Sequence, residues 1–151
     1  MSLFYTPYLL EDQPVLNDVE THHCVKVLRM NKGDELFLTD GKGNLYRAVI
    51  LEVQKKNTFL KIIEKYPEYN KRNYKLHIAI APTKSIDRFE WFLEKATEIG
   101  IDEITPIITK NSERKIIKPE RLKKVIEAAM KQSFKAYQPK INEIISLDKF
   151  V

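Results

Sequence analysis

The sequence contains only one cysteine, Cys24, and four glycines among 151 residues. A single cysteine excludes an intrachain disulfide and a cysteine-rich metal site, and it predicts a reducing, cytoplasmic location. No apolar run reaches the roughly 18 residues that span a bilayer, so we expect no membrane partner. His22, His23 and His77 do not combine with carboxylates at metal-ligand spacing. We therefore predict no metal site, and no nucleotide-binding loop or Ser-His-Asp fingerprint is present either.

The charge that is present is unevenly distributed. The chain has a net charge of +5, yet residues 110–140 alone hold 10 Lys/Arg against 3 Asp/Glu. Such a concentration favours a phosphate-rich partner, because basic side chains that neutralise phosphates release counterions. The alternative is a solvated lysine-rich helix face, which is common in small proteins.

Residues 1–70 have the pattern of a small β domain. We expect strands over residues 35–39, 45–53 and 58–63. The Asp40–Asn44 segment carries two glycines and predicts the turn between the first two strands. Glu20–Leu28 predicts one short helix with Asp18 as its N-cap. Several short strands with one helix indicate a partly closed β-barrel, and the polar stretch 66–73 indicates a linker after it.

Residues 71–151 have the pattern of an α/β domain. The order is an apolar strand over 76–81, a helix over Asp87–Ile99, a strand over 103–108, a helix beginning at Pro119 and a third strand over 140–145. This alternation predicts a parallel sheet with right-handed crossovers, and three strands make it an incomplete one.

Pro106 indicates that the strand over 103–108 is an edge strand or that it ends there. The pair Asp87 and Glu90 resembles a capping box. Each helix carries an apolar stripe at spacings of three and four, formed by Phe89, Phe92, Leu93, Ala96 and Ile99 and by Leu122, Val125, Ile126, Ala129 and Met130.

A series of short motifs carries a resemblance to a known family. The motifs are His23-Cys24-Val25-Lys26-Val27-Leu28-Arg29-Met30, Lys32-Gly33-Asp34, Asp40-Gly41, Ala79-Ile80-Ala81-Pro82-Thr83-Lys84, Trp91-Phe92-Leu93-Glu94-Lys95-Ala96-Thr97-Glu98-Ile99-Gly100, Asn111-Ser112-Glu113-Arg114 and Glu127-Ala128-Ala129-Met130-Lys131-Gln132-Ser133. In order and spacing the series resembles the bacterial 16S rRNA (uracil-N3)-methyltransferases. That group is the ribosomal RNA small subunit methyltransferase E family of the SPOUT class.

The resemblance implies a two-part α+β protein. Residues 1–70 would form a PUA-like RNA-binding β-barrel, and residues 71–151 would begin a knotted SPOUT-type α/β methyltransferase domain. The family uses S-adenosylmethionine to methylate N3 of a uridine in the 16S rRNA of the small ribosomal subunit. The resemblance also implies that the protein forms a homodimer.

The sequence departs from the family in its glycines. The family wraps the cofactor in C-terminal loops that include a Gly-Pro-Glu-Gly-Gly motif, whereas the glycines here are Gly33, Gly41, Gly43 and Gly100. We therefore expect that this chain stops before the cofactor-binding knot. We also expect that it does not bind S-adenosylmethionine and is inactive alone. Whether it is a fragment or a natural truncation stays open.

Candidate RNA-binding residues occur in both parts of the chain. His23, Lys26 and Arg29 are spaced at i, i+3 and i+6, roughly one helix face, which suits phosphate contacts. The alternative is a packed histidine beside solvated cations. Lys84 follows the first strand of the α/β part, and the carboxyl ends of parallel strands are where ligands bind. The alternative for Lys84 is an ordinary loop cation.

Arg114 is the strongest candidate for a catalytic role. Arg114 and Lys115 follow the second parallel strand. Methylation at N3 of uracil requires loss of the N3 proton, and a guanidinium could stabilise the negative charge that spreads onto the ring carbonyl oxygens. Glu113 or Glu127 could act as the general base. The alternative for Glu127 is helix support through an ion pair with Lys131.

Gln132 closes the last of the motifs. Its amide could hydrogen-bond the edge of a base, or it could cap neighbouring backbone. Three functions therefore stay open at this point: an rRNA methyltransferase of which this chain is the RNA-binding part, a non-catalytic PUA-like RNA-binding module, and a dimerisation unit.

Overall fold

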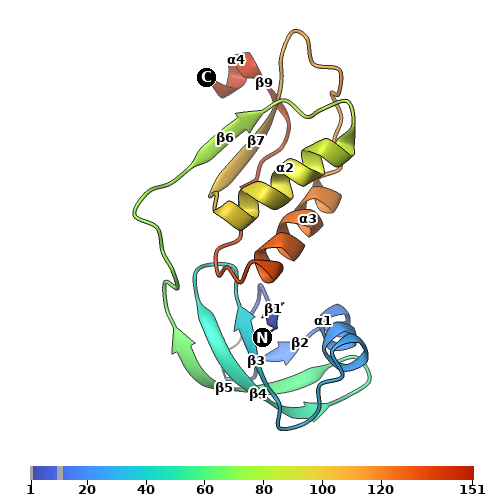
Figure 1. The fold of residues 1–151 in the computed structure, drawn as a ribbon, viewed down its shortest axis with the longest axis vertical. Helices are drawn as coiled ribbons and strands as arrows, with labels where there is room; N and C mark the ends of the chain where they lie inside the picture. The colour runs from blue at the N-terminus through green and yellow to red at the C-terminus, as the bar shows by residue number, and fades with distance from the viewer. Residues whose placement is uncertain (1, 10–11) are drawn as a thin grey trace. The chain divides into compact units, whose positions relative to one another are not determined.

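The computed structural model describes residues 2–9 and 12–151, and the chain divides into two compact units. Unit 1 comprises Met1–Lys71 together with Phe134–Tyr137, and unit 2 comprises Arg72–Ser133 and Gln138–Val151 (Figure 1). The four residues Phe134–Tyr137 lie far outside the range 1–70 that the sequence suggested for the first domain. The chain therefore leaves unit 2 after its second long helix, completes unit 1 and returns.

Unit 1 is built on one five-stranded sheet with the order β1-β3-β4-β5-β2. The strands are β1 (Leu3–Tyr5), β2 (Val15–Leu16), β3 (Glu35–Thr39), β4 (Leu45–Val53) and β5 (Thr58–Tyr66). β1 pairs with β3 in parallel, and the remaining pairs are antiparallel. The pairing of β4 with β5 is irregular at two places, and such irregularities bend a strand. No pairing between β1 and β2 closes the sheet among the residues described.

The core of unit 1 follows the alternation along its strands. Leu36 and Leu38 of β3 and Ala48 and Ile50 of β4 are buried, while the residues between them are more exposed. This period of two is the one expected for a sheet with one buried face. The buried cluster includes Phe4, Leu16, Cys24, Leu36, Leu38, Tyr46, Ala48, Ile50 and Leu60.

The helical segment of unit 1 differs from the single helix expected over Glu20–Leu28. An α-helix, α1 (Asp18–His22), is followed at once by a π-helix, η1 (His23–Val27). The N-cap is Asn17 and not Asp18, because the Asn17 side chain accepts a hydrogen bond from the Glu20 backbone N–H at 2.9 Å. Arg29 lies beyond η1 with φ +54°. The expected face of His23, Lys26 and Arg29 on one α-helix is therefore wrong.

The segment Phe134–Tyr137 is tied to unit 1 by several contacts, and we call it the returning segment. The Ala136 carbonyl accepts hydrogen bonds from the Thr39 hydroxyl (3.1 Å) and from the Gly43 N–H (2.9 Å). The Phe134 ring packs edge-on against Phe37 with 5.3 Å between centroids. Leu3, Leu45 and Ala136 form the buried centre of this small cluster. The returning segment thus completes the apolar packing of unit 1.

Unit 2 contains a parallel sheet whose central strand is β7. Its strands are β6 (His77–Ile80), β7 (Glu103–Ile108), β8 (Lys140–Ile141) and β9 (Ile145–Ser146). The single third strand expected over 140–145 is split, since β8 and β9 pair with successive parts of β7. Pro106 therefore lies in a central strand, not at an edge. It falls in the gap between β8, which ends opposite Ile104, and β9, which begins opposite Ile107, so its missing N–H interrupts no continuous ladder.

Two long helices, α2 (Ile86–Ile99) and α3 (Pro119–Gln132), pack on the sheet of unit 2, and a short helix, α4 (Leu147–Phe150), ends the chain (Figure 1). The predicted stripes supply most of the buried contacts, including Phe89 and Leu93 of α2. Ile99 is an exception and is 84% exposed. The expected capping box is absent, because α2 begins after Ser85 without a side-chain cap and Glu90 pairs with Arg121 of α3. Among the helices of residues 2–9 and 12–151, none combines the length and apolar character that a membrane crossing requires.

Candidate functional site

The carboxyl ends of β6 and β7 lead into two loops that meet in unit 2. The first loop carries Lys84 and the second carries residues 109–118. Together they form an open pocket of about 390 Å³, which we call the strand-end pocket, lined by Lys84, Glu113, Arg114, Lys115 and Ile116. Parallel strands β6 and β7 end at the same edge of their sheet, which explains why residues thirty positions apart line one pocket.

Arg114 joins the two loops. Its Nε donates to the Thr83 carbonyl at 3.0 Å and to the Lys84 carbonyl at 3.2 Å. Its Nη2 donates to the Lys84 carbonyl at 2.7 Å. One edge of the guanidinium fork is therefore occupied by main-chain oxygens of the β6–α2 loop.

The second loop is shaped by a tight turn directly after β7. The Ser112 hydroxyl accepts a hydrogen bond from the Thr109 N–H at 2.8 Å, and the two hydroxyls lie 3.0 Å apart. The Ser112 N–H in turn donates to the Thr109 carbonyl. Hydroxyl side chains commonly fix turns in this way. The turn ends just before Glu113 and Arg114 and so determines where the loop returns to the pocket.

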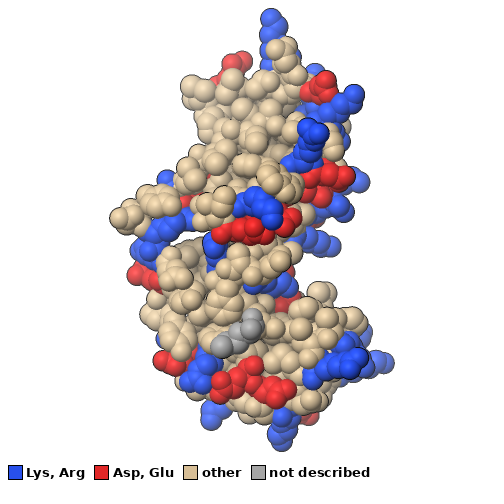
Figure 2. Space-filling model, viewed as in Figure 1, with Lys and Arg blue, Asp and Glu red and all other residues tan. Residues whose placement is uncertain are grey.

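The strand-end pocket is electropositive. Lys84, Arg114 and Lys115 contribute three positive charges against the single carboxylate of Glu113. Within the described part of the chain, neither Lys84 nor Lys115 has a salt-bridge partner. Figure 2 shows further Lys and Arg side chains over unit 2 on the side of α2 and α3. An open site with unpaired ammonium groups suits phosphate oxygens.

Two other cations of unit 2 are already paired. Arg121 forms an ion pair with Glu90, and this hydrogen-bonded contact raises the pKa of Arg121. Lys123 lies 3.4 Å from Glu120 on the exposed side of α3. These pairs stabilise the packing and surface of α2 and α3, so they are less available than Lys84 and Lys115 for a ligand.

The remaining residues singled out by the sequence lie outside the pocket lining. Glu127 and Gln132 are on α3, where Glu127 is half-buried and Gln132 is the last, exposed residue. His23, Lys26 and Arg29 are exposed in unit 1, and the His23 ring lies 5.8 Å from that of Phe4. The structure thus brings together Lys84, Arg114 and Lys115. Sequence reasoning missed Ile116, which only the meeting of the two loops identifies.

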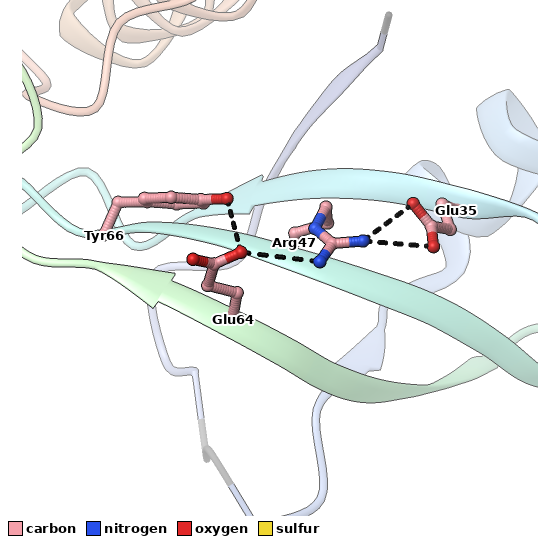
Figure 3. A network of polar contacts seen from close by, with 4 residues as sticks. All are labelled: Glu35, Arg47, Glu64 and Tyr66. Carbon is pink, nitrogen blue, oxygen red and sulfur yellow. Dashed lines mark hydrogen bonds and ion pairs between the residues drawn. The ribbon is translucent and has the colours of Figure 1, made fainter.

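A cross-strand polar network lies on the exposed face of the unit 1 sheet (Figure 3). Arg47 of β4 contacts both carboxylate oxygens of Glu35 at 3.2 Å and one of Glu64 at 3.4 Å. The Tyr66 hydroxyl donates to Glu64 at 2.7 Å. The hydrogen bond from Tyr66 lowers the pKa of Glu64, and the bond to Glu35 raises the pKa of Arg47. The network pairs its one guanidinium with two carboxylates and therefore offers no open anion site.

A second polar cluster lies on the sheet of unit 2. Asn142 donates to Glu103 at 2.6 Å and to the Thr105 hydroxyl at 2.7 Å, and His77 Nε2 lies 2.7 Å from the same hydroxyl. The hydrogen bond from Asn142 lowers the pKa of Glu103. The described residues contain no group of three or more His, Cys, Asp or Glu side chains that could hold a metal ion. The bonds from Asn142 tie the segment between β8 and β9 to β7.

Two family models of RNA methyltransferase domains match this chain. Residues 70–151 match a family model described as an RNA methyltransferase domain, and residues 16–63 match one described as an RNA methyltransferase PUA domain. The first match covers more than half of the chain. The chain therefore belongs to the RNA methyltransferase family represented by that domain.

Particular relatives narrow this class. The chain is 27% identical to the ribosomal RNA small subunit methyltransferase E of Bacillus subtilis, over 97% of this chain and 60% of that protein. A crystal structure of a probable rRNA-methyltransferase from Porphyromonas gingivalis is 41% identical with a TM-score of 0.91, over 99% of this chain and 63% of that one. A ribosomal RNA small subunit methyltransferase E from Neisseria gonorrhoeae, bound to S-adenosyl methionine, is 25% identical with a TM-score of 0.86, over 99% and 64%. The chain thus spans about three fifths of these relatives.

The strand-end pocket does not fit S-adenosylmethionine. The cofactor carries a positively charged sulfonium, and three of the five residues lining the pocket are cationic. Like charges at short range are unfavourable. The same residues fit an anion, so the pocket is better suited to the phosphates of RNA than to the methyl donor.

Proposed function

We propose that this chain is the RNA-holding part of an S-adenosylmethionine-dependent methyltransferase that modifies N3 of a uridine in the 16S rRNA of the small ribosomal subunit. The observation that carries the proposal is the strand-end pocket, where two loops from parallel strands bring Lys84, Arg114 and Lys115 together. Membership of the RNA methyltransferase family and the names of the relatives support it.

Each part of the chain has a proposed role. Unit 1 is a PUA-like β-barrel that holds RNA, with His23, Lys26 and Arg29 as exposed contacts. Unit 2 is the first part of a SPOUT-type domain, and its pocket holds a phosphate beside the target nucleotide. Glu127 as general base and Gln132 as a contact to a base remain predictions. The intact protein acts as a homodimer in the cytoplasm.

The proposed reaction places a specific demand on the pocket. Transfer of a methyl group to N3 replaces the N3–H bond with an N3–CH₃ bond, so a proton must leave and negative charge spreads onto the ring oxygens. Cations that hold the flanking phosphate fix the uracil in place, and their field stabilises that charge. The described residues of this chain supply orientation and electrostatic stabilisation, and the methyl donor supplies the electrophilic carbon.

Titration of the chain with a fluorescent small-subunit rRNA fragment tests the proposal. Each lost phosphate contact lowers the slope of log affinity against log salt by about 0.7 to 0.9. The double variant Lys84→Ala/Lys115→Ala should therefore lower the slope by roughly 1.5. The comparison variant Lys55→Ala/Lys56→Ala, in the exposed β4–β5 turn of unit 1, removes the same charge from residues that do not line the pocket. A slope for Lys84→Ala/Lys115→Ala that equals the slope of the unaltered chain would reject the pocket as an RNA site.

A further inference from the structure

The guanidinium of Arg114 is committed to main-chain carbonyls. Three hydrogen bonds join it to Thr83 and Lys84, at 3.0, 3.2 and 2.7 Å. A guanidinium presents its N–H groups as a rigid planar fork, so two carbonyls can be gripped by one edge. A side chain held in this way has less freedom to approach a ligand than the flexible ammonium of Lys84 or Lys115.

The β6–α2 loop depends on this grip. Ser85, the N-cap of α2, makes no side-chain capping bond with any described residue. The Thr83 hydroxyl donates within the loop, to the Ser85 carbonyl. Of the hydrogen bonds among the described residues, those from Arg114 are the ones that tie Thr83 and Lys84 to the loop after β7. Without them, Thr83 and Lys84 would be held only through the packing of Pro82 and Ile86 on either side.

We propose that Arg114 is a positioning residue that acts on RNA through Lys84, by fixing the β6–α2 loop so that the Lys84 ammonium faces the strand-end pocket. This assignment rests on the proposed function and replaces direct stabilisation of the uracil by Arg114. In this assignment Arg114 fixes the loop and Lys84 contacts the phosphate. Lys115 is a second, independent phosphate contact.

The variant Arg114→Lys distinguishes a role that depends on the shape of the guanidinium from one that depends on its charge. Arg114→Lys keeps the positive charge but replaces the planar fork by a single ammonium, which cannot reproduce the same bidentate contact. Arg114→Lys should therefore lose RNA affinity nearly as much as Arg114→Ala. If Arg114 bound phosphate directly through its charge, Arg114→Lys would retain most of the affinity.

A double-mutant cycle with RNA binding as the readout tests the coupling. The effect of Arg114→Ala should largely disappear when Lys84→Ala is already present, because the ammonium that it positions is gone. The salt slope should fall by about 0.9 for Lys84→Ala and by little more for the double variant. Lys115→Ala is the matched control, and its effect should add to that of Lys84→Ala.

NMR relaxation of the backbone without RNA gives a readout that RNA binding does not influence. The order parameters of residues 83–85 should fall in Arg114→Lys and Arg114→Ala, while those of β7 stay unchanged. Unchanged order parameters at 83–85, or full additivity of Arg114→Ala with Lys84→Ala, would overturn the inference alone. If the unaltered chain fails to bind RNA at low salt, the proposed function falls, and this inference falls with it.

Discussion

At the scale of single residues, Gly43 shows how one position can depend on a distant part of the chain. It has φ +106°, and a Cβ added there would collide with the ring of Tyr137 in the returning segment. Gly43→Ala should therefore lower the free energy of unfolding by about 2 to 4 kcal/mol, through backbone strain plus overpacking. Urea denaturation followed by circular dichroism measures the change.

Gly33 provides the control for that substitution. It also has a left-handed φ, +92°, but a Cβ there would meet no atom within 4 Å. Gly33→Ala should therefore cost only the backbone strain, about 1 to 2 kcal/mol. Equal losses for the two variants would show that the Tyr137 ring moves aside easily and contributes nothing at Gly43.

Cys24 gives a pH-dependent prediction. Its side chain is fully buried, and burial, with smaller contributions from Asp34 and Glu20, raises the pKa of the thiol from 9.0 to about 11. Between these two pH values the unfolded chain loses a proton that the folded chain keeps. The free energy of unfolding contributed by this group therefore falls as pH rises from about 9 to about 11.

Comparison with Cys24→Ala isolates this effect from lysine and tyrosine titration. The variant should be about 1 kcal/mol less stable at pH 8, because a buried sulfur is removed. The gap should shrink as pH rises towards 11, because the variant has no thiol to ionise. Urea denaturation at several pH values measures it, and a gap that stays constant would contradict the raised pKa of the thiol.

At the scale of elements, the first turn of α1 depends on its cap. Asn17 accepts the Glu20 N–H, whereas Asp18 is the first helical residue. Asn17→Ala should lower the free energy of unfolding by about 1 kcal/mol. Asp18→Ala should cost no more than a few tenths of a kcal/mol, from its favourable place near the helix N-terminus. Urea denaturation measures both losses. A larger loss for Asp18→Ala than for Asn17→Ala would show that Asp18 is the N-cap, as the sequence suggested.

The elements that the sequence predicted well are those set by local pattern. β3 and β4 were predicted with their observed ends, because alternating burial and the Asp40-Gly41 turn are local signals. The stripe of α3 was confirmed, with Leu122, Ile126, Ala129 and Met130 buried. The π-helix, the split third strand and the central position of Pro106 were missed. The last two depend on which distant strands pair with them, and a sequence window does not contain that information. The π-helix is a short irregularity within a helical segment, and the sequence pattern carries no separate signal for it.

The position of the site was predictable from the sequence, but its detailed contacts were not. Parallel topology predicted that the loops carrying Lys84 and Arg114 lie at one edge of the sheet, and both line the strand-end pocket. The grip of Arg114 on two main-chain carbonyls was not predictable, because carbonyls are present at every position and leave no signal in the sequence. The contacts of the returning segment were not predictable either, because its Ala136 carbonyl accepts a hydrogen bond from Thr39, which lies 97 positions earlier in the sequence.

At the scale of the whole molecule, the returning segment makes unit 1 depend on residues from beyond α3. Phe134 packs against Phe37 and Tyr69 in unit 1. Phe134→Ala should lower the stability of unit 1 by about 2 kcal/mol, less than for a fully buried ring because Phe134 is half-buried. Hydrogen exchange should show faster opening of β3 and β4.

Phe150 is the matched control for this prediction. It is also a half-buried phenylalanine late in the chain, but its ring packs against His77 in unit 2. Phe150→Ala should leave the exchange of β3 and β4 unchanged. If the two variants open β3 and β4 alike, the returning segment is not a specific support of unit 1.

The central claim is that RNA is held at the strand-end pocket of unit 2 as well as by unit 1. Photo-crosslinking of the chain to a small-subunit rRNA fragment containing 4-thiouridine, followed by mass spectrometry of the peptides, tests it most directly. We predict crosslinked peptides that contain Lys84 and residues 113–116, and their yield should fall at high salt. Crosslinks confined to unit 1, with none at either loop of the pocket, would contradict the account.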